Sequence, residues 1–173
     1  MNRAGNLWES LIAPETLYNA FYRVLRGKRS QSTAGDIFRD LEGELARLRE
    51  ELADNSYRPG EYRSFYIHEP KERLISAAPL RDRIVHHAVM AVLEPVFERR
   101  FIHHSYACRT GKGTHKALRQ FVEWGRETRY ALKLDIRKFF PSIDHELLKE
   151  MLARYIKDRR VLDLCGLIID NSN

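Results

Sequence analysis

The sequence contains little cysteine and no long hydrophobic segment. Only two cysteines, Cys108 and Cys165, occur among its 173 residues, which excludes a disulfide framework and favours the reducing cytoplasm. No apolar run approaches the ~18 residues that a membrane-spanning helix needs. Glu9, Pro14 and Glu15 interrupt the N-terminal segment, so it does not resemble the core of a signal peptide. We therefore expect a cytoplasmic protein without a membrane partner.

Two common ligand-binding motifs are also absent. The string "RTGKGT" at 109–114 has two glycines and a lysine, but their order does not match the G-x-x-x-x-G-K-[ST] pattern of a P-loop. His103, His104 and Cys108 lie close together in the sequence, but their spacing matches no common zinc site. These departures disfavour an ATPase and a zinc-binding module.

The charge is basic and unevenly distributed. Hydrophobic residues make up 43% of the chain and charged residues 31%, which is typical of a globular domain or of part of a larger protein. The net charge is +6. Between Pro70 and Gly113, eight Lys or Arg residues accompany four acidic ones, and four of the seven histidines lie there too. Such a concentration fits a nucleic-acid partner, although an ordinary solvated helix surface has similar charges.

Hydrophobic periodicity predicts a chain rich in helices. It favours a short helix within 13–30, an amphipathic helix over 37–55, a long helix from Pro79 to near Pro95, and helices that begin near Thr114, after Asp144 as N-cap, and at Arg159. A basic loop rich in small residues, 27–36, separates the first two. In the helix after Thr114, we expect Leu118, Phe121 and Val122 to face the interior.

Strand signals occur in two places. Residues 62–75 are rich in aromatic and β-branched types and predict two short strands joined by the charged turn "EPKER". Residues 130–135 alternate in character and predict a strand that ends at Asp135. Pro141 disfavours a helical conformation at Phe140, so we expect that residue to be extended. The expected fold class is α+β, helix-rich with a small antiparallel sheet.

Three residues in these segments are candidates for a site, each with an ordinary structural alternative. Lys71 and Arg73 in the charged turn would suit a triphosphate, but a solvated turn carries the same residue types. Asp135 at the end of a strand could bind a metal ion, yet a lone acid at such a place is more often structural.

Longer strings resemble the reverse transcriptases of bacterial retroelements, which include group II intron proteins, retron enzymes and diversity-generating retroelement enzymes. The similar strings are "EPKERLISAAPLRDRIVHHAVMAVLEPVFERRF", "SYACRTGKGTHKAL" and "ALKLDIRKFFPSID", within roughly 57–169. The resemblance implies a right-hand polymerase fold. Residues 1–55 would form an N-terminal helical extension, 56–128 the fingers and 129–173 the start of the palm.

The resemblance also implies roles for individual residues. Asp135 matches the first catalytic aspartate, which would bind Mg²⁺ together with the backbone carbonyl of Ile136. Phe140 matches the aromatic residue that excludes a ribose 2′-hydroxyl. The implied reaction is two-metal nucleotidyl transfer that copies an RNA template into cDNA.

Three cations match residues that contact the nucleotide or the template. Lys71 and Arg73 resemble the fingertip cations over the incoming triphosphate, in a turn that is shorter than in many intron enzymes. Arg109 matches the basic residue of the "SYxxR" block. The implied partners are an RNA template, a DNA or RNA primer, and dNTPs.

The chain departs from the family most in the blocks that it lacks, one of which contains Ser-Gln. The Tyr-x-Asp-Asp turn that supplies the other catalytic carboxylates does not occur in it, and Asp144 and Asp170 lie at helix ends. We expect that turn and the thumb to lie beyond Asn173, so the chain by itself is expected to be inactive. The alternative is a non-catalytic RNA-binding or assembly module derived from the same fold.

Overall fold

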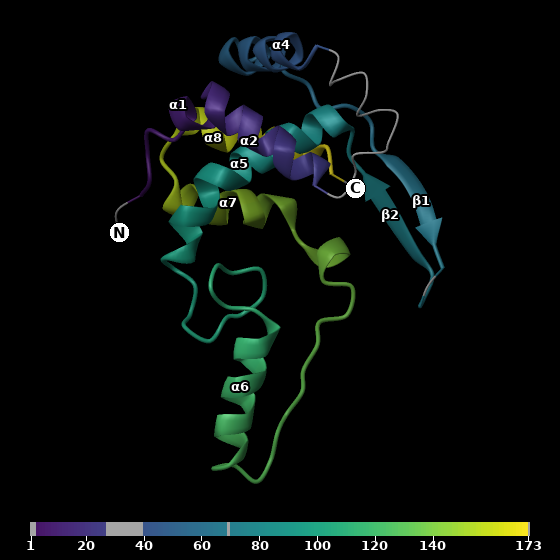
Figure 1. Ribbon diagram of the computed structural model, residues 1–173, viewed down its shortest axis with the longest axis vertical. Coiled ribbons are helices and arrows are strands. Elements are labelled where there is room, and N and C mark those ends of the chain that lie inside the picture. The colour runs from purple at the N-terminus through teal and green to yellow at the C-terminus, as the bar shows by residue number, and fades with distance from the viewer. Residues whose placement is uncertain (1–2, 27–39, 69, 173) are drawn as a thin grey trace. The chain divides into compact units, whose positions relative to one another are not determined.

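The computed structural model describes residues 3–26, 40–68 and 70–172 (Figure 1). Its elements are α1 (Trp8–Leu11), α2 (Pro14–Leu25), α4 (Leu41–Ala53), β1 (Arg63–Ile67), β2 (Arg73–Ala77), α5 (Leu80–Glu98), α6 (Thr114–Gly125), a 3₁₀ turn η1 (Phe140–Ser142), α7 (His145–Tyr155) and α8 (Arg159–Asp170). The described part is rich in helices and has a two-stranded antiparallel sheet, which confirms the expected content. The loop predicted at 27–36 lies outside the described residues.

The chain divides into two compact units. The first comprises 1–94 and 144–173, and the second comprises 95–143. The functional boundaries predicted at 55/56 and 128/129 do not coincide with this division and stay a prediction. Among the described helices, none is long and apolar enough to cross a membrane.

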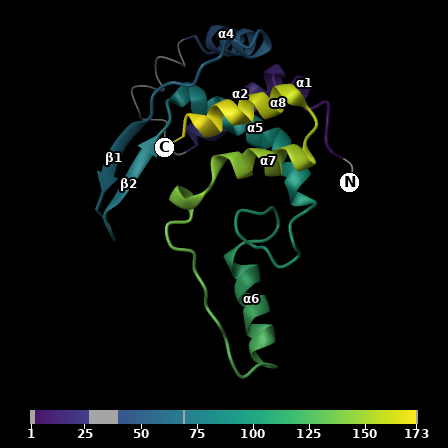
Figure 2. The same cartoon turned by 180° about the vertical axis from the view of Figure 1, so that it is seen from behind.

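The first unit has a helical core built from the predicted apolar stripes. On α2, Leu17, Phe21 and Val24 are buried, as the three- and four-residue spacing predicts. On α4, Leu45 and Leu48 are buried in the same way. α2 packs against α4, and α7 packs against α8; the helices of this unit lie together in both Figure 1 and Figure 2.

Proline and aspartate residues set the helix boundaries. α5 begins directly after Pro79, as predicted, and continues through Pro95 to Glu98, less than one turn beyond the proline. Asp144 caps α7, because its carboxylate accepts a hydrogen bond of 2.9 Å from the amide of Leu147. The predicted N-cap is therefore confirmed.

The carboxylate of Asp158 joins the two ends of the chain. Its Oδ2 accepts hydrogen bonds from the amides of Leu7 (2.9 Å) and Trp8 (3.0 Å), and the same side chain caps α8 at Val161. Beside it, Ala4 forms a parallel bridge with Ile156. Asp158 thus serves the first turns of two helices that are about 150 residues apart in sequence.

Arg160 extends this junction to a third segment. Its guanidinium carbon lies 4.1 Å from the centroid of the Trp8 ring. Its Nη2 also donates hydrogen bonds to the carbonyls of Leu52 and Ala53, at the end of α4. Segments from the beginning, the middle and the end of the chain therefore meet around one carboxylate and one guanidinium.

Two predictions for the second unit are wrong. Residues 130–135 form no strand, and Leu132 and Leu134 are exposed. Leu118 and Phe121 of α6, expected to face the interior, are each 58% exposed. Periodicity reports which face of a segment is apolar, but a strand also needs a hydrogen-bonded neighbour and a buried face needs an opposing surface. The described residues of this unit supply neither.

The expected extended conformation of Phe140 is also wrong. Phe140 begins the 3₁₀ turn η1, in which the amide of Ser142 donates to the carbonyls of Lys138 and Phe139, each at 3.1 Å. The hydroxyl of Ser142 donates to the carbonyl of Phe139 as well, at 2.8 Å. Pro141 lies in the first positions of the turn. A backbone N–H at such a position has no carbonyl partner within the turn, so the missing N–H of proline costs no hydrogen bond. Local hydrogen bonds therefore outweigh the preference of a residue that precedes proline.

We expect Asp158→Ala to lower the free energy of unfolding by about 1–3 kcal/mol, because amides in two helix starts lose their acceptor. Urea denaturation followed by circular dichroism measures this change. Asp163→Ala is the control, since Asp163 is an exposed carboxylate within α8, the helix that Asp158 caps. Equal stabilities of the two variants would contradict a shared capping role for Asp158.

Candidate nucleotide and metal site

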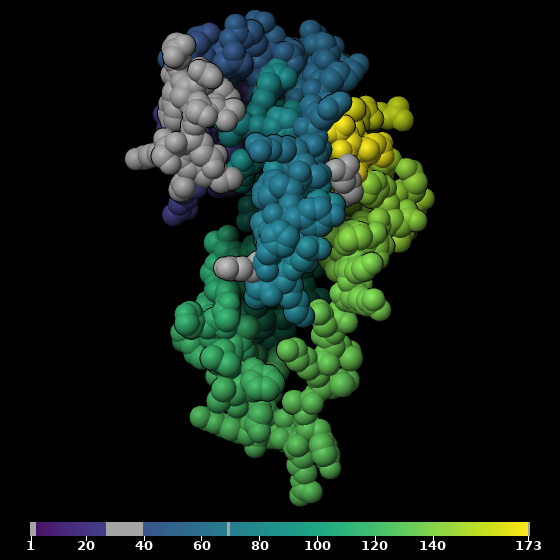
Figure 3. Space-filling view, turned by 90° about the vertical axis from the view of Figure 1, so that its right-hand side faces the viewer, coloured from purple at the N-terminus to yellow at the C-terminus, as the bar shows by residue number. Residues whose placement is uncertain are grey.

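The predicted charged turn connects two paired strands. β1 and β2 are antiparallel, with Ile67 opposite Arg73 and Arg63 opposite Ala77. The hydroxyls of Ser64 and Ser76, which face each other in this register, lie 3.1 Å apart. Figure 3 shows this hairpin at the surface of the first unit, and every residue of β1 is exposed. Side chains at its tip are therefore accessible to a ligand.

Lys71 and Arg73 are both exposed at the end of this hairpin. Lys71 lies in the turn, whereas Arg73 is the first residue of β2. Glu72 between them is 3.4 Å from the imidazole of His68. Neither cation forms an ion pair with a carboxylate of the described residues. They remain candidates for binding the phosphates of a nucleotide.

A buried carboxylate holds the base of the hairpin. Asp82, on the first turn of α5, is 2% exposed. It accepts hydrogen bonds from the Tyr57 hydroxyl (2.7 Å) and from the amide of Gly60 (2.8 Å). Burial and the hydrogen bond to Asp82 raise the pKa of Tyr57, so its hydroxyl stays a proton donor. Asp82 thus ties the chain before β1 to the helix after β2.

Sequence reasoning missed this role of Asp82. An acid in the first turn of a helix is ordinarily explained by the helix dipole alone. The available signal was Gly60, which precedes the hairpin. A Cβ at Gly60 would lie 3.0 Å from Cγ of Pro79, so the segments before β1 and after β2 approach each other closely.

Arg109 organises the loop between α5 and α6 in the second unit. Its side chain is 9% exposed. Its Nε lies 2.9 Å and its Nη2 2.8 Å from Oε1 of Glu98, while Nη1 donates to the carbonyls of Ile102 (2.8 Å) and Ser105 (3.1 Å). The guanidinium also lies over the ring of Phe101. These contacts engage its donors within the protein; contact with a nucleotide or template stays a prediction.

The same loop carries Lys112 and two glycines. Nζ of Lys112 donates to the carbonyl of His103 at 2.7 Å. Gly111 and Gly113 have φ values of +68° and +101°, a region that residues with a Cβ rarely adopt. The glycines therefore permit the path that the contacts of Arg109 and Lys112 stabilise.

Asp135 lies in the extended segment that follows α6. It is exposed, and no side chain of the described residues forms an ion pair with it. Ile136, whose carbonyl was predicted to bind the same ion, is 64% exposed. The pair offers a carboxylate and a carbonyl oxygen, which are ligands that Mg²⁺ accepts.

This ligand set is only part of a metal site. Within 3–26, 40–68 and 70–172, no three His, Cys, Asp or Glu side chains are grouped so that they could hold a metal ion. The oxygen chemistry at Asp135 and Ile136 therefore fits Mg²⁺, but a two-metal centre needs carboxylates beyond these residues.

Phe140 has an accessible ring close to Asp135 in sequence. It is 81% exposed, and its ring packs edge-on against that of Phe139, with 5.4 Å between the centroids. An exposed aromatic ring is suited to contact a sugar, as the gate prediction requires.

Comparison with known proteins places these residues in one family. The family model described as "Reverse transcriptase (RNA-dependent DNA polymerase)" matches residues 67–172, which include every candidate residue above. The chain belongs to the reverse transcriptase family. The resemblance first drawn from three short strings is thereby confirmed.

Several relatives of this reverse transcriptase chain are similar over most of its length. Protein YkfC of Escherichia coli is 33% identical over 94% of the chain and 46% of its own length. The group II intron-encoded protein LtrA of Lactococcus lactis is 27% identical, over 91% and 27% respectively. Nuclear intron maturase 2, mitochondrial, of Arabidopsis thaliana is 29% identical, over 72% and 19%. The chain thus spans less than half the length of each of these three relatives.

We expect Arg109→Ala to loosen the loop at 102–113, because Glu98 and two carbonyls lose their donor. Amide hydrogen exchange in that loop should accelerate by about tenfold or more. Arg119→Ala, which removes an exposed cation from α6, is the control. Unchanged exchange in the Arg109 variant would show that the buried network does not hold the loop.

Proposed function

We propose that the complete gene product is an RNA-directed DNA polymerase of a retroelement that copies RNA into cDNA by two-metal nucleotidyl transfer. One observation carries this proposal: the family match at 67–172 contains the whole candidate set. The members of that set are Lys71, Arg73, Arg109, Asp135, Ile136 and Phe140. In this proposal, residues 56–128 act as fingers and 129–173 as the beginning of a palm.

The fingertip cations bind the incoming nucleotide. Lys71 and Arg73 are exposed and have no acidic partner among the described side chains, so their charge is available to a triphosphate. Arg73 can bind two phosphate oxygens at once through its planar fork, whereas Lys71 acts as a point charge. In the second unit, Arg109 keeps the loop at 102–113 in shape, and we assign it a place near the template or the nucleotide.

Asp135 and Ile136 supply two oxygen ligands for Mg²⁺. When bound, the ion assists deprotonation of the primer 3′-hydroxyl and neutralises charge on the leaving pyrophosphate. Phe140 presents its ring to the sugar and excludes a 2′-hydroxyl.

The partners follow from this activity. The template is RNA, the primer is DNA or RNA, and the substrates are dNTPs. A net charge of +6 supports binding of a phosphate backbone. The low cysteine content supports a cytoplasmic location.

A second function is favoured by a specific observation. The described residues provide one candidate metal-binding carboxylate and no cluster of three ligands, and one relative bears the name of an intron maturase. The chain would then act as a non-catalytic RNA-binding or assembly module. The two functions differ in whether the complete gene product incorporates nucleotides.

We expect Asp135→Asn in the complete gene product to abolish primer extension on an RNA template, with little loss of template binding. The amide keeps the shape of the side chain but removes the negative charge that Mg²⁺ requires. Incorporation of labelled dNTP and fluorescence anisotropy of the template measure the two properties. The control is Asp163→Asn, at an exposed carboxylate in α8.

Persistent synthesis by the Asp135 variant would rule out its role as a ligand. An unmodified gene product that binds RNA but never incorporates dNTP would favour the non-catalytic module. The 173-residue chain by itself is expected to show no extension.

We expect Phe140→Ala in the complete gene product to admit ribonucleotides, because the ring that blocks the 2′-hydroxyl is removed. The preference for dNTP over rNTP should fall by at least about tenfold, since a lost steric contact of this size is worth 1–3 kcal/mol. Single-nucleotide incorporation kinetics measure the ratio. Phe139→Ala is the matched control at the adjacent ring, and an unchanged ratio in the Phe140 variant would exclude the gate.

A further inference from the structure

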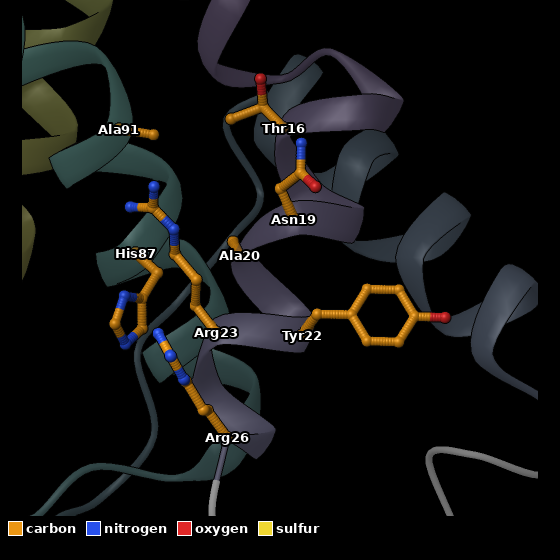
Figure 4. A pocket seen from close by; sticks show the side chains of 8 residues that line it. All are labelled: Thr16, Asn19, Ala20, Tyr22, Arg23, Arg26, His87 and Ala91. Atoms are coloured by element: carbon orange, nitrogen blue, oxygen red, sulfur yellow. The ribbon is translucent and has the colours of Figure 1, made fainter.

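A hollow of about 480 Å³ lies between α2 and α5 of the first unit. Its lining comes from Thr16, Asn19, Ala20, Tyr22, Arg23, Arg26, His87 and Ala91 (Figure 4). On α2, residues spaced three or four apart share the side next to the buried stripe. The small side chains of Ala20 and Ala91 leave the space open. We call this hollow the α2–α5 pocket.

Two arginines and a histidine line the pocket from the two helices. Arg23 and Arg26 extend from α2 on the side where His87 projects from α5, whereas Tyr22 points away (Figure 4). Burial lowers the pKa of His87 most, and the charges of Arg23 and Arg83 lower it further. The imidazole therefore lies in a positive field. Among the described residues that line the pocket, none is a carboxylate.

Some arginines of the first unit have carboxylate partners. Arg47 pairs with Asp40 and Glu44 on its own helix, and Arg81 pairs with Glu51. For Arg23 and Arg26, the described residues provide neither an ion pair nor an acceptor for a side-chain hydrogen bond. Two guanidinium groups that line one pocket without an anion repel each other electrostatically.

We propose that the α2–α5 pocket binds a phosphate group of an RNA backbone. Two guanidinium groups can surround the oxygens of a phosphate with paired hydrogen bonds. Asn19, exposed at the same side of α2, adds an amide donor. The hydroxyl of Thr16 is already used, because it donates to the carbonyl of Ser10 at 2.7 Å. This inference rests on the RNA partner of the proposed function but uses none of its nucleotidyl-transfer residues.

The first test measures binding of a fluorescent single-stranded RNA to the 173-residue chain by anisotropy over a series of salt concentrations. Arg23→Gln combined with Arg26→Gln should weaken binding by about tenfold or more. The slope of log K against log salt should fall by about 0.7 for the loss of one phosphate contact. The control combines Arg47→Gln with Lys149→Gln, which removes two cations that already pair with carboxylates.

A second variant tests the pocket without removing an arginine. Asn19→Glu places a carboxylate beside Arg23 at an exposed helix position, so it should repel the phosphate and weaken binding as well. Circular dichroism of each variant checks that the helices are retained.

Imidazole NMR signals give a local measurement. His87 signals, assigned with His87→Gln, should shift on addition of the RNA, and those of His145 in α7, which does not line the pocket, serve as reference. Inorganic phosphate is added in a parallel titration. Saturation by phosphate with no response to RNA would overturn the assignment to a backbone.

The remaining outcomes separate this inference from the proposed function. If the unmodified chain binds RNA and the Arg23/Arg26 variant matches the control, the pocket is excluded and the proposed RNA partner stands. If the unmodified 173-residue chain binds no RNA, the pocket inference fails, whereas the proposed function is decided separately by primer extension with the complete gene product. A loss of affinity and salt dependence confined to the pocket variants, with a shift at His87, supports the inference.

Discussion

The first unit depends on one carboxylate that accepts hydrogen bonds from both ends of the chain. Asp158 accepts from the amides of Leu7 and Trp8 and also caps α8. The first turn of a helix leaves several amides without partners, and here a single carboxylate accepts hydrogen bonds at two helix starts. Because Trp8 also lies under Arg160, whose donors reach the end of α4, three segments are held at one point. The α2–α5 pocket and the base of the hairpin belong to the unit that this junction closes.

A second carboxylate connects that core to the hairpin. Asp82 is buried and holds both Tyr57 and Gly60, so the strands emerge from a fixed base while their tip stays exposed. Rigid support with an accessible end is what a phosphate-binding fingertip requires. In the second unit, Arg109 has the corresponding task, since its donors are directed to Glu98 and to loop carbonyls. Asp82 and Arg109 thus shape the fold through their contacts, whereas Lys71 and Arg73 remain exposed.

Much of the fold was predictable because local rules act within short segments. The stripes of α2 and α4, the start of α5 after Pro79 and the cap at Asp144 follow from spacing and from hydrogen-bonding chemistry. The strand at 130–135 and the inward face of α6 were wrong for a common reason. An alternating pattern identifies an apolar face, but Leu134 and Phe121 are exposed since no described element lies opposite them. Phe140 was wrong because a 3₁₀ turn with its own hydrogen bonds forms there.

The sequence by itself determined the family, the helical content and the identity of the candidate residues, because strings such as "LKLDIRKFFPSID" carry their information in residue order. Only the tertiary structure decided which charges are free. Arg73 and Arg109 look equivalent in the sequence, yet one is exposed in a hairpin and the other is enclosed by Glu98 and two carbonyls. The α2–α5 pocket likewise combines Arg23 with His87, which are far apart in sequence. Burial and the choice of partner depend on contacts between distant segments, and those contacts exist only once the chain has folded.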